Sequence, residues 1–386
     1  LVDRALAAPA PLPAIVVDDT RKGLGRLGRH WRQRFAPVLI AITGSNGKTT
    51  TKEMLAAILR SHAGEAGALA TRGNLNTDIG VPLTLLNLRA GHRYCAVELG
   101  MNHPGEIAML ADIARPTIAV VTNAQREHME FMKSVEATAE ENASVFRALP
   151  DSGIAVVNAD DACHPIFAAA AGGRRKLEFG LARGEVRGRY ALQALESEIV
   201  VTTPAGEAQA TLAIAGLHNV RNALAAAACA HAAGVPPAAI GAGLQAFRPY
   251  SGRLQVKRTA AGATLIDDSY NANPDSVRAA IDVLVCCPGP TALVLGDMGE
   301  VGAQGAEFHA EVGRYAREKG VNVLIAFGTA SKQSAVAFGN GARHFDDWNE
   351  IPASLKSMNT VLVKGSRIMK MERVVAALAG EKVAAH

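Results

Sequence analysis

The chain has 386 residues, of which 49% are hydrophobic and 20% charged, so it can bury more than one core and is expected to form two or three domains. Its net charge is only +4 and aromatic residues make up 4%, which argues against the basic, aromatic-rich surface of a nucleic-acid binder. No apolar run approaches the roughly 20 residues that span a bilayer, so no membrane insertion is expected. Small anionic ligands are the expected partners.

The cysteines and the N-terminus suggest the cellular compartment. Five cysteines form no CxxC pair and no disulfide framework for this length, so we expect reduced thiols and a cytoplasmic location. The N-terminal segment lacks the charged start and long apolar stretch of a signal peptide. The chain begins with Leu1 rather than Met, which suggests that upstream residues are missing.

The first half of the chain alternates apolar runs with helical patterns. Residues 38–42, 94–100 and 117–123 are predicted strands, with helices after 47, from 104 and around 135–149. Continuous apolar strands separated by helices predict a parallel sheet covered on both faces. Residues 185–214 alternate in short segments and predict a small antiparallel insertion, and the alanine-rich 216–234 returns to helix.

A second α/β series begins near Gly252. Its predicted strands cover 264–270, 291–298, 322–328 and 360–366, and each is followed by a helical pattern. The turn-rich segment 247–253 is the predicted hinge between the two series. The first 36 residues contain a possible strand and a helix, too few for a domain of their own.

The segment "AITGSNGKTTTKEM" predicts a phosphate-binding loop. An apolar strand ends in two glycines and a lysine, and a helix begins at once. Glycines let backbone N–H groups turn toward a phosphate, and the helix N-terminus adds positive potential. Ile42 stands where the general pattern has glycine, so the match is to a shortened GxxGKT variant. A glycine turn that happens to contain lysine is the alternative, but the strand–loop–helix order favours a nucleotide triphosphate site. The predicted nucleotide contacts here are Gly44, Ser45, Asn46, Gly47, Lys48, Thr49 and Thr50.

The order of further segments resembles the Mur ligase family. "TRGNLNTDIGVPLTLL", "VELGMNHPGEI", "GLHNVRNALAA", "PYSGRLQV", "LIDDSYNANPDS", "LGDMGEVG" and "VKGSRIMKMERV" follow the loop in the expected sequence, from about Asp18 to Ala377. The resemblance implies an α/β fold: a central parallel-sheet ATPase domain (37–250), with the small antiparallel insertion, followed by a Rossmann-like C-terminal domain (251–386). Residues 1–36 would be a linker and the remnant of an N-terminal domain that grips the UDP end of the substrate.

The resemblance also implies a reaction. "DDSYNANP" and "LGDMGE" point to the branch that joins D-alanyl-D-alanine to UDP-N-acetylmuramoyl-tripeptide in peptidoglycan precursor synthesis. ATP would phosphorylate the tripeptide carboxylate, and the dipeptide amine would then displace phosphate from the acyl phosphate. This chemistry requires charge neutralisation more than covalent help from the protein. ATP and Mg²⁺ are the expected cofactors, and a monomer is the expected state.

The resemblance assigns catalytic and metal roles in the first half. Lys48 would contact the transferring phosphate, Thr49 and Glu98 a magnesium ion, and His128 a second magnesium ion. The alternatives are a solvated strand-end carboxylate for Glu98 and a surface-loop histidine for His128. The family usually carries a carbamylated lysine as a metal ligand after this histidine, where this chain has Asn142. Either the Asn142 amide or a neighbouring carboxylate (Glu140 or Glu141) would replace this lysine, or the second metal ion would be bound in a different way.

The remaining predicted contacts also follow the resemblance. Asn222, Arg253 and Asp268 would contact the nucleotide, although Asn222 has the alternative of a structural helix-start network formed without it. The segment after residue 268 would orient the dipeptide, or its Asn-Pro turn would simply cap the next helix. Basic residues after the last strand suit a carboxylate or phosphate, and the loop after residue 72 would reach the peptide or be purely structural. The predicted substrate contacts are Asn74, Asn76, Thr77, Tyr270, Asn271, Asn273, Ser276, Lys364 and Arg367.

Two other functions compete with this ligase. A folylpolyglutamate-type or single-amino-acid Mur ligase would carry a different dipeptide-facing loop. A nucleotide-binding fragment without ligase turnover is favoured by Asn142 and by the absent N-terminal domain. If that domain is truly absent, weaker precursor binding and slower chemistry are expected, because remote contacts help to position the reacting groups.

Overall fold

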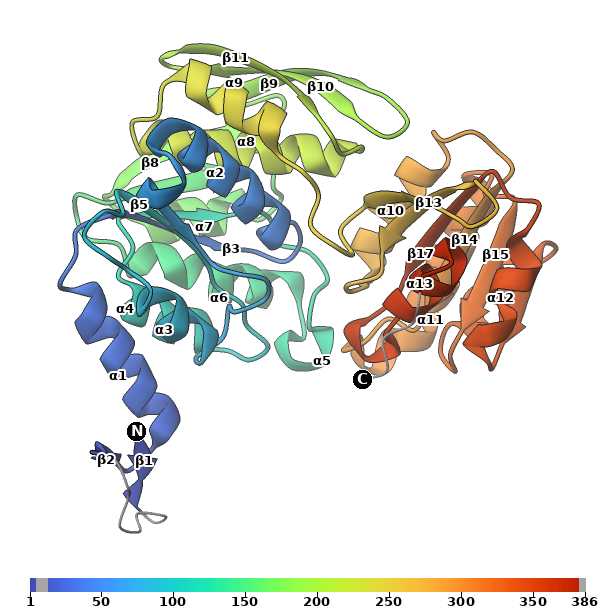
Figure 1. Cartoon of the computed structure of the whole chain (residues 1–386), viewed down its shortest axis with the longest axis horizontal. Coiled ribbons are helices and arrows are strands. Elements are labelled where there is room, and N and C mark those ends of the chain that lie inside the picture. Colours follow the sequence, from blue (N-terminus) through green and yellow to red (C-terminus); the bar gives the residue numbers. More distant parts are fainter. Residues whose placement is uncertain (5–12, 382–386) are drawn as a thin grey trace.

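Two large β-sheets organise the computed structural model, which describes residues 1–4 and 13–381 (Figure 1). Residues 5–12 of the N-terminal segment and 382–386 of the C-terminal unit lie outside the described residues, so the predictions for them have no structural counterpart. None of the described helices is long and apolar enough to cross a membrane.

The first sheet has nine strands in the order β11-β10-β9-β8-β7-β6-β3-β5-β4. Strands β3 to β8 are mutually parallel where they pair, as predicted. The segment predicted as a small antiparallel insertion pairs antiparallel, β9 with β10 and β10 with β11, and it extends this sheet because β9 pairs parallel with β8. The strands are β3 (Val38–Thr43), β4 (Ala68–Ala70), β5 (Tyr94–Glu98), β6 (Ile118–Val121), β7 (Ile154–Asn158), β8 (Arg175–Gly180), β9 (Val186–Leu192), β10 (Ser197–Thr203) and β11 (Gly206–Leu212).

Alternate residues of β3 point into two different cores. Ile40 and Ile42 pack with α2, α8 and α9, whereas Leu39 and Ala41 pack with α3, α4, α6 and α7. Helices therefore cover both faces of the sheet, which is why its strands are continuously apolar. The helices are α2 (Lys48–Ala63), α3 (Gly80–Leu85), α4 (Glu106–Ala114), α5 (Met129–Met132), α6 (Val135–Arg147), α7 (His164–Ala171), α8 (Leu217–Ala232) and α9 (Pro237–Ala246).

The second sheet has six strands in the order β12-β13-β17-β14-β15-β16, and only β12 pairs antiparallel. Its strands are β12 (Gln255–Arg258), β13 (Thr264–Asp268), β14 (Thr291–Gly296), β15 (Val323–Phe327), β16 (Ala342–Phe345) and β17 (Thr360–Lys364). The helices are α10 (Pro274–Leu284), α11 (Gly305–Glu318), α12 (Lys332–Phe338) and α13 (Glu372–Ala379), with short 3-10 turns at Gly302–Gln304, Trp348–Glu350, Pro352–Leu355 and Arg367–Met369.

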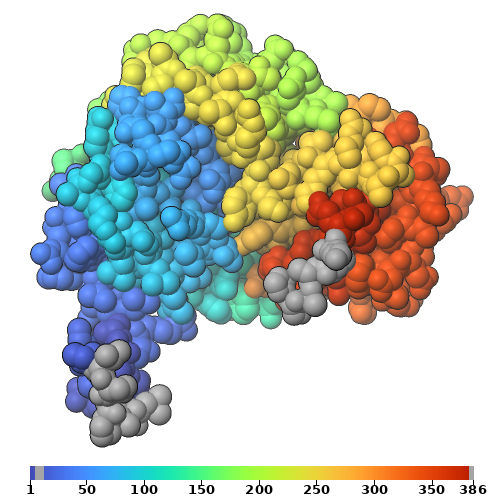
Figure 2. Space-filling model, viewed as in Figure 1, coloured from blue at the N-terminus to red at the C-terminus, as the bar shows by residue number. Residues whose placement is uncertain are grey.

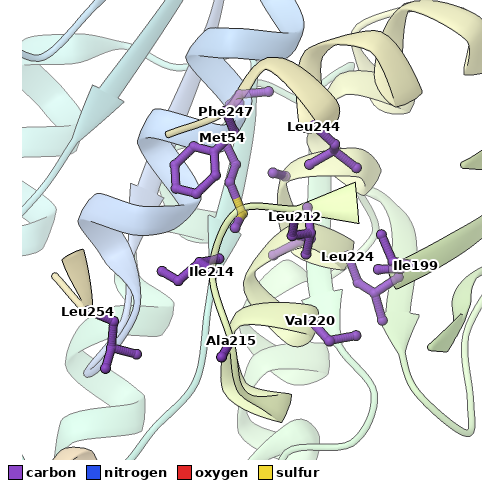
Figure 3. Packing of buried hydrophobic residues seen from close by; sticks show 14 of the residues in the cluster. Met54, Ile199, Leu212, Ile214, Ala215, Val220, Leu224, Leu244, Phe247 and Leu254 are labelled. Atoms are coloured by element: carbon purple, nitrogen blue, oxygen red, sulfur yellow. The ribbon is translucent and has the colours of Figure 1, made fainter. Parts of the chain in front are cut away.

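The two sheet units share buried contacts. Figure 3 shows Leu254, at the start of the second unit, near Ile214 and Ala215 of the segment that leads into α8, and all three belong to one hydrophobic cluster. In the space-filling view, the second unit (yellow to red) lies directly against the first (Figure 2). The N-terminal α1 (Thr20–Arg32), with the small pair β1 (Val2–Asp3) and β2 (Val16–Val17), projects away from both sheets (Figure 1).

Candidate functional site

The phosphate-loop segment joins β3 to α2 in a conformation that requires glycine. Gly44 has a φ of 128° and Gly47 a φ of 83°. A Cβ at Gly44 would lie 2.1 Å from the Thr122 hydroxyl, and one at Gly47 would lie 2.1 Å from Asn222 Oδ1. Helix α2 then begins at Lys48 without a side-chain cap, so its first N–H groups remain available to an anion.

Lys48 is held on the loop by three oxygen atoms. Its Nζ donates to the carbonyls of Gly44 (2.5 Å) and Ser45 (3.0 Å) and to Glu127 Oε1 (2.9 Å). The lysine is thus already paired with an anion at the position predicted to receive a phosphate.

Glu98 ends β5 next to the start of α2. Its Oε1 accepts hydrogen bonds from Thr49 Oγ1 at 3.2 Å and from Asn76 Nδ2 at 2.9 Å. The residue is 1% exposed, and Oε2 is buried without a hydrogen-bond partner. An unpaired buried carboxylate oxygen beside a hydroxyl suits a hard cation that prefers oxygen ligands. Asn76, which was predicted to contact substrate, donates a hydrogen bond to this carboxylate.

His128 lies between two carboxylates. Its Nε2 is 3.5 Å from Glu127 Oε1 and its Nδ1 is 2.5 Å from Glu300 Oε2, which belongs to the second unit. Burial alone would lower the pKa of His128, but the hydrogen bonds with Glu127 and Glu300 outweigh it and raise the pKa to about 9. His128 therefore lies where the two units meet.

Asn142 supports the phosphate loop from within α6. Its Oδ1 accepts from Thr43 Oγ1 at 2.7 Å and from the Gly44 N–H at 2.9 Å, and its Nδ2 donates to the Thr138 carbonyl. The neighbouring carboxylates have other roles: Glu140 binds Arg147, and Glu141 accepts N–H groups at the start of α4. Asn142, Glu140 and Glu141 all have hydrogen-bond partners within the protein.

The second unit supplies the opposite wall of the site. Arg253 Nη2 lies 3.4 Å from Thr49 Oγ1, and the guanidinium stacks on the Tyr270 ring with 4.0 Å to its centroid. Lys364 Nζ donates to Asp268 Oδ2 at 2.6 Å and to the Asn271 carbonyl at 2.8 Å. Burial lowers the pKa of Lys364, although its pairing with Asp268 opposes this effect.

Asn273 joins the units and also caps a helix. Its Nδ2 donates to Asn46 Oδ1 at 2.9 Å across the interface. Its Oδ1 accepts the Ser276 N–H, and the Ser276 hydroxyl lies 3.0 Å from the Asn273 backbone N, which forms a capping box at α10. The turn therefore caps α10, as the structural alternative expects. The side chains of Asn273 and Ser276 also line a cavity at the phosphate loop.

Two cavities meet at the phosphate loop. The larger, of about 810 Å³, extends from Lys48 to the basic residues of α1 and is also lined by Thr77, Tyr270 and Asn271. The smaller, of about 370 Å³, is lined by Thr50, Asn222 and Asp268 among others. Asn74 and Arg367 line neither cavity: Asn74 is exposed, and Arg367 pairs with Glu372 at 3.1 Å.

Sequence reasoning missed four residues that complete the site. Arg126 and Glu127 precede His128 directly, Gln125 accepts a hydrogen bond from Asn46 Nδ2, and Glu300 binds His128. The sequence signal for three of them was their place beside a predicted histidine at a strand end. Glu300 lies within the "LGDMGE" segment, but nothing in that segment indicates a partner 172 positions away.

Comparison with known proteins identifies the family. The Mur ligase middle domain matches residues 42–230, and the domain described as "Mur ligase, glutamate ligase domain" matches residues 252–367. The UDP-N-acetylmuramoyl-tripeptide--D-alanyl-D-alanine ligase of Escherichia coli (strain K12) is 40% identical over 376 residues, which cover 95% of this chain and 82% of that relative. The chain belongs to the Mur ligase family.

Solved structures agree with this membership. MurF from Acinetobacter baumannii superposes with a TM-score of 0.90 at 35% identity, covering 96% of this chain and 84% of that chain. The MurF ligase from Thermotoga maritima, solved in complex with ADP, has a TM-score of 0.84 at 24% identity and covers 97% and 87% of the two chains. The second likeness supports the fold alone. The predicted α/β fold class and family are thus confirmed, and the enzyme class of the family is ATP-dependent amide-bond formation.

Proposed function

We propose that this chain joins D-alanyl-D-alanine to UDP-N-acetylmuramoyl-tripeptide, using ATP and passing through an acyl phosphate. The observation that carries the proposal is the meeting of two cavities at the phosphate loop, where Gly47 and Thr49 line both, with Arg253 and Lys364 on the opposite wall. The printed activity of the Escherichia coli relative supports the choice of substrates. The smaller cavity would take the nucleotide and the larger would take the tripeptide end and the dipeptide.

Charge neutralisation is the main contribution of the chain's residues to the first step. The tripeptide carboxylate attacks the outer phosphorus of ATP, and ADP leaves. Lys48 and Arg253 would stabilise the negative charge on the transferring group, which requires Lys48 to exchange Glu127 for phosphate. In the second step the dipeptide amine attacks the acyl carbon, loses a proton and displaces phosphate. Asn271 and Tyr270 would orient the dipeptide.

Mg²⁺ fits the residues at the start of α2. Thr49 Oγ1 and the unpaired Glu98 Oε2 offer two oxygen ligands, and His128 was the predicted ligand of a second ion. Within residues 1–4 and 13–381, no group of three or more His, Cys, Asp or Glu side chains forms a metal cluster. Nucleotide oxygens and water would therefore complete the coordination. When bound, Mg²⁺ would neutralise phosphate charge.

We also propose the predicted division into 1–36, 37–250 and 251–386. The two sheets, and the helices that pack on each of them, support the boundary near residue 250. The cysteines Cys95, Cys163, Cys229, Cys286 and Cys287 are free, which supports the proposed cytoplasmic location. We further propose that the chain is a monomer and that it does not bind nucleic acid.

Magnesium-dependent phosphate release from ATP tests the function. We expect release only when UDP-N-acetylmuramoyl-tripeptide and D-alanyl-D-alanine are both present, with the ligated product detected by mass spectrometry. Lys48→Ala is expected to abolish release. ATP binding without substrate-dependent release would instead support a nucleotide-binding protein, and release with a single amino acid would support a related ligase.

A further inference from the structure

Arg221, near the start of α8, is an exposed cation on the wall of the smaller cavity. The other lysine and arginine residues of this wall are engaged, because Lys364 pairs with Asp268 and Arg253 stacks on Tyr270. The guanidinium of Arg221, by contrast, forms no hydrogen bond or ion pair with any residue that the structure describes. A guanidinium that lines a cavity with its donors unused is available to a ligand.

The geometry of α8 turns Arg221 away from the phosphate loop. Asn222 faces the loop, because a Cβ at Gly47 would lie 2.1 Å from its Oδ1. Successive residues of an α-helix are about 100° apart around its axis, so Arg221 points about 100° away from Asn222, with His218 between them. Since the phosphates would occupy the loop end of the cavity, Arg221 lies toward the end that would take the nucleoside.

Polar side chains of the neighbouring loops are engaged with the backbone. Asn158 donates to the Thr122 carbonyl at 2.8 Å, and the two carboxylate oxygens of Asp161 accept the N–H groups of Ala124 and Cys163. A large part of their hydrogen-bonding capacity is therefore used within the protein. Recognition of a base in this part of the cavity falls largely to its flat faces.

Side chains that stack on a base are scarce on this wall. None of the described residues that line the smaller cavity is Phe, Tyr or Trp. His218 offers an imidazole, and burial lowers its pKa to about 4, so the ring is neutral near pH 7. Asn219 Nδ2 holds this ring by donating to its Nε2 at 3.0 Å. Because Arg253 already stacks on Tyr270, Arg221 provides the guanidinium that remains free to stack.

We propose that the guanidinium of Arg221 stacks on the base of the bound nucleotide, and that this contact is its contribution to binding. The proposal rests on the proposed function and deepens it by adding a residue that favours a purine base. Arginine suits this role, because its planar group stacks on π-systems and is more weakly hydrated than an ammonium. A purine presents a larger face than a pyrimidine, so the contact favours ATP over UTP.

Tripolyphosphate separates the contribution of the base from that of the phosphates. Calorimetry with Mg²⁺ present would measure the affinity of the whole chain and of Arg221→Ala for a non-hydrolysable ATP analogue and for tripolyphosphate. The variant should bind the analogue about tenfold more weakly, because a stacked group is lost, and should bind tripolyphosphate as the unchanged chain does. An equal loss for both ligands would show that Arg221 acts on the phosphates through its charge, and would overturn the proposal.

A lysine at this position keeps the charge and removes the flat group. Arg221→Lys should bind the analogue about as weakly as Arg221→Ala, whereas the affinity of the unchanged chain would show that charge alone matters. Arg187→Ala is the matched control, because Arg187 is exposed on β9 and lines neither cavity. It should leave both affinities unchanged, and a loss equal to that of Arg221→Ala would contradict a local contact.

Comparison of bases gives the second test. The unchanged chain should bind ATP more tightly than UTP, and Arg221→Ala should reduce the ratio of the two affinities at least about threefold, because the purine loses more stacked area. An unchanged ratio would refute stacking. If the unchanged chain binds neither the analogue nor tripolyphosphate, the proposed function itself fails. That result is distinct from tight binding of both ligands that Arg221→Ala leaves intact, which overturns the role of Arg221 alone.

Discussion

Asn142 illustrates how a single residue supports the site without facing the ligand. It is fully buried, and its side-chain oxygen accepts two hydrogen bonds from the segment that begins the phosphate loop. One of them comes from the Gly44 N–H, a buried backbone donor. Removing the acceptor would leave this buried donor unsatisfied, which typically costs about 1–3 kcal/mol.

Asn142→Ala should therefore destabilise the chain by about 1–3 kcal/mol and weaken nucleotide binding, because the loop loses its support. Thermal unfolding and calorimetric titration with ADP would measure the two effects. Ser144→Ala is the matched control: the Ser144 hydroxyl is buried on the same helix without a partner, so its removal should be neutral or slightly stabilising. If Asn142→Ala and Ser144→Ala have the same unfolding temperature and the same affinity for ADP, Asn142 does not support the loop in this way.

At the scale of elements, the sequence predicted the long apolar strands and the helices after them. Strands β5, β6, β13, β14, β15 and β17 lie within the predicted segments, and β3 is one residue longer than its predicted segment. Strands β4, β7, β8, β12 and β16 were not predicted. Gln255–Arg258 and Ala342–Phe345 contain charged residues and only four positions each, and they become strands because they pair with the edges of an existing sheet.

The candidate site was predicted in the same uneven way. Strand-end residues such as Glu98 and loop residues such as Lys48 occupy a place that the parallel-sheet topology dictates, so they were found. Glu127 was not found, because its importance depends on Lys48, which is 79 positions earlier in the chain. Contacts of this kind arise from the tertiary fold and have no local pattern.

The packing of α9 on α2 links the core to the loop. A Cβ at Gly243 would lie 2.2 Å from Ile58 Cα in α2, the helix that begins at Lys48. Gly243→Ala should thus lower the free energy of unfolding by at least about 1–3 kcal/mol through overpacking. Thermal unfolding measures the effect. Gly173→Ala is the control, because nothing lies within 4 Å of its added Cβ, and a similar loss there would refute the packing explanation.

At the scale of the whole molecule, Arg126 connects the two sheet units. Its guanidinium binds Asp275 of α10 (Nη2–Oδ1 2.6 Å) and Glu311 of α11 (Nη1–Oε2 2.7 Å), and its backbone N–H also donates to Asp275. The three side chains are 22–25% exposed. Paired, multiply hydrogen-bonded contacts of this kind are stronger than isolated surface ion pairs. Since Arg126 precedes Glu127 and His128, the same contact that holds the units together also positions the partner of Lys48 and the predicted metal ligand.

Arg126→Ala should therefore loosen the closed arrangement and slow turnover more than it weakens ATP binding. We expect about a tenfold lower kcat, a smaller change in KM for ATP, and a larger radius of gyration by small-angle X-ray scattering, since closure completes such sites. The effect should shrink in high salt, where the unchanged chain also loses part of this attraction. Arg189→Ala is the matched control, because Arg189 forms an exposed ion pair with Glu207 within the first sheet unit. If Arg126→Ala retains both the kcat and the radius of the unchanged chain, then closure depends on other contacts between the units, such as Asn46 with Asn273, Arg253 with Thr49 and His128 with Glu300, and not on this ion pair.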